Sequence, residues 1–318
     1  MKCTVEWNSL SAKDWLVYFN RIPQSNLLQH PDYIRAMCRK DHQRARFGLI
    51  VMDGQPAGLV SILEAGILWN AIHGVMLDRG PLWFPGFGNA VHVKLFMEAF
   101  SQEFPVRFLR RRRIIPEIQD GATARKIIES TGLSRRSDQT GYDTFWVKTD
   151  QDERFLRDSW RQCLHKAQRA ALKVTWDDQG HLVPWMCAQY AADKSAKGYP
   201  GPSPRLLTLL SQEMASSRSM IVGQVRQDSA SIPGGQIIAG VLLVCHGRSA
   251  TYLAGWTGSM GREVSAHHLL LWQSLNMLKQ RGIWELDLGG FNETTAQGVK
   301  LFKEGMGGTV FRGVGHYY

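Results

Sequence analysis

The stretch Phe47–Leu63, FGLIVMDGQPAGLVSIL, decides the fold class, because Met220–Val244, MIVGQVRQDSASIPGGQIIAGVLLV, repeats its pattern. In the first stretch, two apolar runs flank an Asp-Gly turn at Asp53, a dipeptide that suits a tight hairpin because glycine tolerates positive φ. A longer loop joins the two runs of the second stretch. Both second runs begin with Ala-Gly, at Ala57 and Ala239, and continue in branched aliphatic residues. The sequence therefore predicts one hairpin unit used twice.

Each predicted hairpin is followed by further strand, an amphipathic helix and a last strand. An antiparallel hairpin with a helical crossover after it predicts an α/β fold with mixed sheets. We expect two such domains, over 1–147 and 148–318. The predicted helix and last strand cover 89–104 and 106–113 in the first half, and 265–282 and 283–290 in the second.

A basic helix is predicted between the two halves, over 152–171. Apolar residues form one stripe along it, and the remaining surface carries mostly positive charge. A solvated face and a face that contacts phosphates both fit this pattern. The residues of this helix that we consider for phosphate contact are Arg161, Lys166 and Arg169.

Four consecutive arginines, Arg110, Arg111, Arg112 and Arg113, form the most concentrated charge in the sequence. Alternation in a strand turns two of them toward each face, and burying even one unpaired guanidinium costs several kcal/mol. We therefore expect them at a strand end. A solvated sheet edge and a phosphate-binding surface both stay open as interpretations.

The composition is that of a globular protein, with 318 residues of which 44% are hydrophobic and 21% charged. No run approaches the roughly 18 apolar residues of a membrane span, and the N-terminus is too polar for a signal peptide. We therefore expect a cytoplasmic protein without a transmembrane segment. The five cysteines are scattered and predict neither a disulfide framework nor a zinc site.

The formal net charge of +10 points toward a polyanionic partner. Nucleic acid, a nucleotide-linked substrate and an acidic membrane surface are all compatible with it, and so is a role in solubility alone. The adjacent His267 and His268 cannot share one helical face, so we expect one packed, one exposed, and no metal site.

Four short motifs occur in order along the chain: RGP at Arg79–Pro81, RQCLHKAQRAALKV at Arg161–Val174, DLGG at Asp287–Gly290 and FKEGMGG at Phe302–Gly308. Together with the duplicated α/β unit, they resemble the FemAB family of aminoacyl-tRNA-dependent transferases, over nearly the whole chain. The resemblance implies tandem GNAT-like acyltransferase domains, of which the second carries the DLGG and Phe-Lys motifs.

The resemblance also implies that Phe302 and Lys303 lie at the active site. An aminoacyl ester attacked by an amine passes through a tetrahedral oxyanion, and a fixed cation such as Lys303 stabilises it. Asp287, at a strand end, either accepts the proton of the attacking amine or holds the following turn, and both roles stay open. Further candidates for substrate binding are Arg79, Tyr252, Trp256, Gly289, Gly290 and Asn292.

The leading hypothesis is a transferase that joins an aminoacyl group from aminoacyl-tRNA to an amine of a small-molecule or peptide acceptor, such as a natural product or a peptidoglycan precursor. This chemistry needs no cofactor, and the charged tRNA is a co-substrate. Two alternatives are a GNAT N-acyltransferase that uses acyl-CoA and a non-catalytic RNA-binding protein.

Two departures from known patterns bear on these hypotheses. The segment GWTGSMGREVSAHH, at 255–268, lacks the glycine-rich loop that holds the pyrophosphate of acyl-CoA in GNAT enzymes, which weighs against CoA. Members of the FemAB family that act on peptidoglycan precursors tend to have an acidic residue shortly after RGP. Leu82, Trp83 and Phe84 occupy these positions here and disfavour a cell-wall acceptor.

Overall fold

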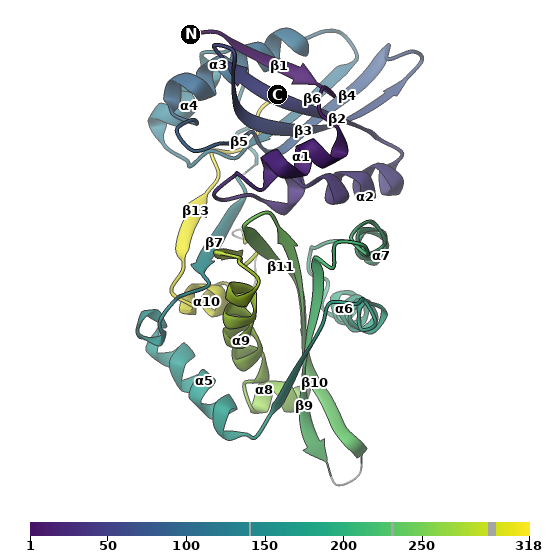
Figure 1. Ribbon diagram of the computed structural model, residues 1–318, viewed down its shortest axis with the longest axis vertical. Coiled ribbons are helices and arrows are strands. Elements are labelled where there is room, and N and C mark those ends of the chain that lie inside the picture. The colour runs from purple at the N-terminus through teal and green to yellow at the C-terminus, as the bar shows by residue number, and fades with distance from the viewer. Residues whose placement is uncertain (140, 230–231, 292–296) are drawn as a thin grey trace. The chain divides into compact units, whose positions relative to one another are not determined.

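The structure is a computed structural model that describes residues 1–139, 141–229, 232–291 and 297–318. It divides into two compact units, Met1–Asp143 with Phe311–Tyr318, and Thr144–Val310 (Figure 1). The sequence had suggested a single cut between 147 and 148. The difference arises because the last residues return to the first unit, where Tyr317 forms bridges with Ile114 and Arg135.

The first unit contains a sheet in the order β1-β2-β3-β4-β6, with β5 paired to β3. The predicted hairpin is confirmed, since β2 and β3 pair antiparallel and turn at Asp53 and Gly54, which have φ of 47° and 80°. β6 runs parallel to β4 and forms the end of this order. The strands are β1 (Cys3–Trp7), β2 (Arg44–Met52), β3 (Gln55–Ile67), β4 (Ile72–Gly80), β5 (Leu82–Trp83) and β6 (Arg110–Pro116).

The helix predicted over 89–104 is present as α3, and its side chains fill the core of the first unit. Asn89 caps it by accepting hydrogen bonds from the backbone N–H groups of Val91 and His92. Phe96 and Phe100, fully buried on one face, pack in the cluster that also contains Tyr317. The helices of this unit are α1 (Ala12–Phe19), α2 (Pro31–Asp41), α3 (Ala90–Glu103) and α4 (Ala122–Glu129), with a 3-10 turn at Leu27–Gln29.

The second unit is built on a sheet in the order β13-β7-β12-β11-β10-β9-β8. The second predicted hairpin is confirmed as the antiparallel pair β9 and β10. The prediction of a longer loop within it is wrong, because β9 continues to Ser229 and β10 already begins at Ile232. β12 pairs parallel with β11 only as far as Asp287, whereas β11 continues to Thr257. The strands are β7 (Asp143–Lys148), β8 (Lys173–Asp177), β9 (Met220–Ser229), β10 (Ile232–His246), β11 (Ser249–Thr257), β12 (Glu285–Asp287) and β13 (Thr309–Arg312).

The helix predicted over 265–282 is confirmed as α9, whose buried leucines form much of the core of the second unit. The helix predicted over 152–171 is shorter, because Leu156 and Arg157 have extended backbone with ψ of 141° and 147°. A 3-10 turn at Glu153–Phe155 precedes it. The helices are α5 (Asp158–Arg169), α6 (Val183–Lys197), α7 (Pro204–Glu213), α8 (Ser259–Glu263), α9 (Ala266–Gln280) and α10 (Gln297–Gly305).

None of the helices in the described part of the chain combines the length and the apolar character that crossing a bilayer demands.

Candidate active site

Lys303 is a buried lysine in the last turn of α10. Its Nζ donates hydrogen bonds to the backbone carbonyls of Gly289, at 2.9 Å, and Gly290, at 3.0 Å. Burial lowers the pKa of this amine from 10.5 to about 8, and the nearby carboxylate of Asp287 acts in the opposite direction. The side chain therefore leaves bulk solvent, as the family resemblance implies, and its cation lies against the turn that follows β12.

Asp287 holds that turn. It is the last residue of β12, is fully buried, and accepts hydrogen bonds from the N–H of Gly289 at 2.8 Å and from the hydroxyl of Thr144. Gly289 has φ of +77°, and a Cβ there would lie 3.1 Å from the carbonyl oxygen of Tyr252. The turn-holding role of Asp287 is confirmed, whereas proton transfer by this residue stays a prediction.

Thr144 is a residue of this site that the sequence did not single out. Its hydroxyl lies between the carboxylate of Asp287 and the carbonyl of Gly289, 3.1 Å from the latter oxygen. Thr144 belongs to β7, which pairs antiparallel with β12 although 137 residues separate Lys148 from Glu285. No local sequence pattern predicts the pairing of two strands that are so far apart in the sequence.

An aromatic cluster surrounds Phe302, the residue before Lys303. Its ring centroid lies 6.0 Å from that of Trp160, 5.6 Å from His267 and 4.9 Å from His268. These contacts attach α10 to α5 and α9 and fix where the next side chain points. The expectation that one of the two histidines is exposed is wrong, because both pack on the Phe302 ring. Contact of Phe302 with substrate stays a prediction.

Tyr252 and His267 form a buried polar pair beside this cluster, with Tyr252 Oη 3.0 Å from His267 Nε2. Burial lowers the pKa of His267 to about 4 and raises the pKa of Tyr252 above its usual range. Both side chains are therefore neutral at physiological pH. The Nδ1 atom of His267 has no hydrogen-bond partner among the described residues.

Trp256 packs edge to face on Trp185, with ring centroids 5.9 Å apart, so its predicted stacking on a base or ribose stays a prediction. After it, the segment 255–268 contains the short helix α8, which begins after Gly258. Ser265, with φ of 56°, separates α8 from α9. Gly289 and Gly290 lie in the turn under Lys303, and Asn292 lies outside the described residues.

Arg79 lies in the first unit and is almost fully buried. Its guanidinium makes a bidentate ion pair with Glu117, through Nε at 2.8 Å and Nη2 at 2.7 Å. The same group lies over the ring of Tyr142, 4.2 Å from its centroid. These contacts give Arg79 a structural role in the first unit, and its contact with substrate stays a prediction.

The four arginines of β6 alternate as predicted, with Arg110 and Arg112 half-buried and Arg111 and Arg113 exposed. Arg110 Nε lies 3.2 Å from His73 Nδ1, and Arg112 Nη1 donates to the carbonyl of Phe104 at 3.1 Å. Most of their charge is therefore presented along one sheet edge.

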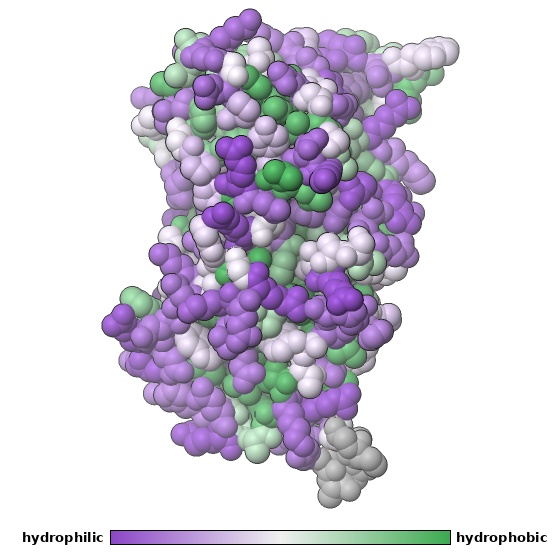
Figure 2. Space-filling model, in the orientation of Figure 1, coloured by the Kyte–Doolittle hydropathy of each residue, from purple (hydrophilic) through white to green (hydrophobic). Residues whose placement is uncertain are grey.

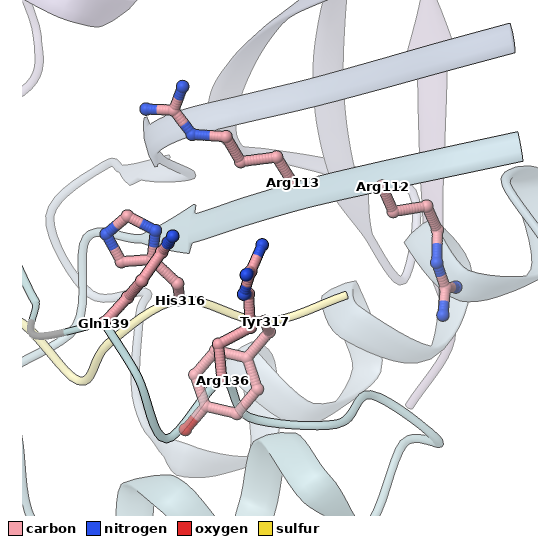
Figure 3. A pocket seen from close by; sticks show the side chains of 6 residues that line it. All are labelled: Arg112, Arg113, Arg136, Gln139, His316 and Tyr317. Carbon is pink, nitrogen blue, oxygen red and sulfur yellow. The ribbon is translucent and has the colours of Figure 1, made fainter.

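A cavity of about 310 Å³ opens beside this edge (Figure 3). Two of its arginines already have carboxylate partners, Arg113 with Asp78 at 3.3 Å and Arg136 with Asp138 at 3.0 Å. Figure 3 shows the guanidinium of Arg112 pointing away from these two. The residues that line the cavity are Arg112, Arg113, Arg136, Gln139, His316 and Tyr317.

The basic face predicted on the connecting helix is present on α5, in the second unit. Lys166 and Arg169 are exposed, whereas Arg161 forms an ion pair with Asp158 in the first turn. Phosphate contact by these residues and by the β6 arginines stays a prediction. Within the described ranges, no group of three or more His, Cys, Asp or Glu side chains gathers as a metal site would require.

Comparison with known proteins adds to this geometry. Residues 154–303 match the family described as the acetyltransferase (GNAT) domain. The solved structure of FemX has a TM-score of 0.80, with 13% identity over 98% of this chain and 96% of that one. No curated protein has a sequence that matches this chain.

Two further solved structures share the fold. A tandem GNAT protein from the clavulanic acid biosynthesis pathway has a TM-score of 0.51, with 11% identity over 98% of this chain and 97% of that one. The C-terminal domain of a putative lysylphosphatidylglycerol synthetase from Agrobacterium fabrum has a TM-score of 0.53, with 13% identity over 96% and 92%. The fold is thus a tandem GNAT-like, FemAB-like one, as expected from the sequence.

Proposed function

We propose that this chain, with the fold of FemX and a GNAT-type second unit, is an acyltransferase that moves an aminoacyl group from aminoacyl-tRNA to an amine. The acceptor is a small molecule or a peptide. The observation that carries the proposal is Lys303, a buried cation fixed by two backbone carbonyls at the end of β12. A lysine that serves only as a surface charge gains nothing from burial and a fixed position. A group that stabilises an oxyanion must be held in place before the reaction.

The reaction joins the acceptor nitrogen to the ester carbonyl carbon and breaks the bond from that carbon to the ribose oxygen. The nitrogen loses a proton and the ribose oxygen gains one, so the products are an amide and free tRNA. Negative charge develops first on the carbonyl oxygen and then on the leaving oxygen. A single well-placed cation stabilises both, because the two oxygens share one carbon atom.

Lys303 has the donors for this role. An ammonium carries three N–H groups, and two of them go to Gly289 and Gly290. In this proposal the third N–H goes to a substrate oxygen. With a pKa of about 8 the amine is still mostly protonated at pH 7, yet it releases a proton more easily than an ordinary lysine. It can therefore also protonate the leaving ribose oxygen.

Asp287 and Thr144 act in this proposal as positioning residues. They hold the turn whose carbonyls hold Lys303, and the carboxylate of Asp287 favours the charged form of the lysine. Because these groups are fixed by hydrogen bonds before substrate arrives, little reorganisation is needed during the reaction.

The donor is the finer part of the proposal. The basic surfaces of β6 and α5 favour a polyanionic donor such as tRNA. The match to an acetyltransferase family favours the alternative, a GNAT enzyme that uses acyl-CoA. For the acceptor, Leu82 and Phe84 after the RGP motif are buried in the core and present no polar group, which supports an acceptor other than a cell-wall precursor.

The donor can be tested with a mixture of tRNAs charged with radiolabelled amino acids and a panel of diamines and short peptides. We expect label to pass to an acceptor as an alkali-stable amide only while the tRNA is intact. Product that still forms after complete ribonuclease digestion, or that forms from acetyl-CoA in the absence of tRNA, would assign the enzyme to the acyl-CoA class instead.

A further inference from the structure

The β3–β4 hairpin of the first unit extends beyond the strands on either side of it. β2 begins at Arg44, opposite Glu64 of β3, and β6 begins at Arg110, opposite His73 of β4. Residues 65–72 therefore form a two-stranded tip that projects past the body of the sheet (Figure 1). Strand pairing with β2 and β6 does not account for this extension.

The tip carries large apolar side chains in full contact with water. Trp69 is 101% exposed, Leu68 65% and Ile67 61%. The neighbouring loop adds Phe108, which is 87% exposed, and Val106, which is 77% exposed. Over most of the face shown in Figure 2, hydrophobic residues instead lie scattered among hydrophilic ones. A local concentration of this kind marks an interaction site rather than ordinary surface.

Two hydrogen bonds join the tip and the loop into one patch. The side chain of Arg107 donates to the carbonyl of Asn70, and the N–H of His73 donates to the carbonyl of Leu109 at 3.0 Å. The patch, which we call the apolar tip, consists of Ile67, Leu68, Trp69, Ile72, Val106 and Phe108.

The turn at the tip has an unusual backbone. Leu68, Trp69 and Asn70 have φ of 52°, 53° and 65°, in the left-handed region that favours glycine and asparagine. Each bulky residue held there costs about 1 kcal/mol or more. Glycine at these positions would relieve the strain without loss of any core contact, since both side chains are exposed. Folding alone therefore gives no reason for leucine and tryptophan here.

Positive charge surrounds the apolar tip. Arg107, Arg110 and Arg111 lie at its base, because β6 starts opposite the residue that follows Ile72. The acidic side chains of this region are already engaged: Arg46 lies 2.7 Å from Glu103 and 3.7 Å from Glu64. Glu64 also lies 3.4 Å from His73. The arginines at the base therefore leave the patch with a positive rim.

We propose that the apolar tip docks the protein on the surface of an anionic phospholipid bilayer. The bilayer surface has an apolar layer of acyl chains beneath a layer of anionic headgroups. The tryptophan and aliphatic residues at the projecting end match the acyl chains, and the arginines behind them match the headgroups. RNA offers the arginines a partner but leaves Ile67, Leu68 and Ile72 in water. Of these two partners, the lipid surface satisfies charge complementarity and apolar insertion together.

The test is flotation of the purified full chain with lipid vesicles. We expect binding to vesicles of phosphatidylcholine with one quarter phosphatidylglycerol, little binding to phosphatidylcholine alone, and weaker binding in 0.5 M salt. The double variant Leu68→Ser/Trp69→Ser should lower the partition coefficient about tenfold or more. Arg107→Gln should lower it about fivefold.

A matched control is Trp284→Ser, which removes a tryptophan that is 53% exposed in the second unit and lies under Arg248. It should float like the wild type. Circular dichroism and thermal melts of the double variant should also match the wild type, because neither side chain packs in the core. Binding of uncharged tRNA by the double variant should be unchanged, so this test is independent of the proposed reaction.

Three results would overturn the proposal. They are failure of the wild-type chain to float with phosphatidylglycerol vesicles, equal flotation of the double variant, and dissociation of an oligomer by the double variant in lipid-free sedimentation. The last result would show that the apolar tip binds protein rather than lipid.

Discussion

The amino group of Lys303 and the backbone carbonyl of Gly289 lie 2.9 Å apart, and this contact joins the last turn of α10 to the turn after β12. Two backbone carbonyls thus hold the cation, and the carboxylate of Asp287 is near enough to favour its charged form. A lysine kept in its charged form can stabilise new negative charge.

Replacing Lys303 with methionine tests its role directly. Methionine keeps most of the aliphatic stem, and we expect kcat to fall by roughly 10² to 10³, the loss typical of removing one oxyanion donor. Acceptor affinity should hold, because the interaction forms mainly in the transition state. Single-turnover rates measure the effect. Lys300→Met, an exposed lysine of the same helix, is the control and should keep the wild-type rate.

The melting temperature of Lys303→Met should change little. The variant leaves two carbonyls without their donor, which costs about 1–3 kcal/mol. It also removes a charge whose pKa, lowered from 10.5 to about 8, shows that burial disfavours the ammonium by about 3 kcal/mol. The two effects oppose each other. A collapsed melt with a proportionate loss of activity would mean that the lysine serves the fold alone.

The rate should decline at alkaline pH as Lys303 loses its proton. With a folded-state pKa of about 8, the charged form disappears as the pH rises through that value, and kcat should then fall by up to about tenfold per pH unit. Lys303→Arg keeps its charge to higher pH, so its profile should lack this decline even at a lower absolute rate. Persistence of the same decline in the arginine variant would assign it to another group.

Stability should show the opposite trend with pH. The unfolded chain binds the Lys303 proton more tightly than the folded chain, so between about pH 8 and 10.5 the unfolded state holds more protons. The free energy of unfolding of the wild type, relative to Lys303→Met, should therefore increase through this window. Urea unfolding of both proteins at pH 7.5 and pH 9.5 measures the difference, and a constant difference would contradict the lowered pKa.

Thr144→Val tests whether the Thr144 hydroxyl supports the site, because valine has nearly the same side-chain volume as threonine. The variant removes the hydroxyl that bonds Asp287 and leaves a buried carboxylate short of one partner, so unfolding should become easier by about 1–3 kcal/mol. kcat should fall more than KM rises, because the turn under Lys303 loosens. Thr208→Val, on an exposed face of α7, is the control for the loss of a hydroxyl and should leave both quantities unchanged.

The basic face of α5 can be tested by the salt dependence of tRNA binding. If Lys166 and Arg169 contact phosphates, replacing each with glutamine should reduce the slope of log K against log salt by about 0.7 to 0.9. Lys94→Gln, on α3 of the first unit, should leave the slope as it is. An unchanged slope for Lys166→Gln/Arg169→Gln would mean that this face is simply solvated.

Local patterns predicted most of the fold. The Asp53-Gly54 turn, the alternation of the β6 arginines and the helix that became α9 all depend on residues close together in the sequence. The helix over 152–171 was predicted too long, because its polar and apolar spacing continues through Leu156 and Arg157 although their backbone is extended.

Long-range pairing is what the sequence did not reveal. Thr144 reaches Asp287 only because β7 lies beside β12, and the aromatic neighbours of Phe302 come from α5 and α9. The apolar tip was also missed, since its leucine and tryptophan read as ordinary strand residues until their exposure is known. Exposure depends on where the neighbouring strands begin, which is a property of the whole sheet.

The return of Phe311–Tyr318 to the first unit has a consequence for synthesis. Tyr317, fully buried in the core that contains Phe96 and Phe100, emerges from the ribosome after the entire second unit. The first unit is therefore translated first but completed last. Its core lacks Tyr317 until Thr144–Val310 has been synthesised. Nascent chains released before Phe311 should show a protease-resistant second unit beside a protease-sensitive first one.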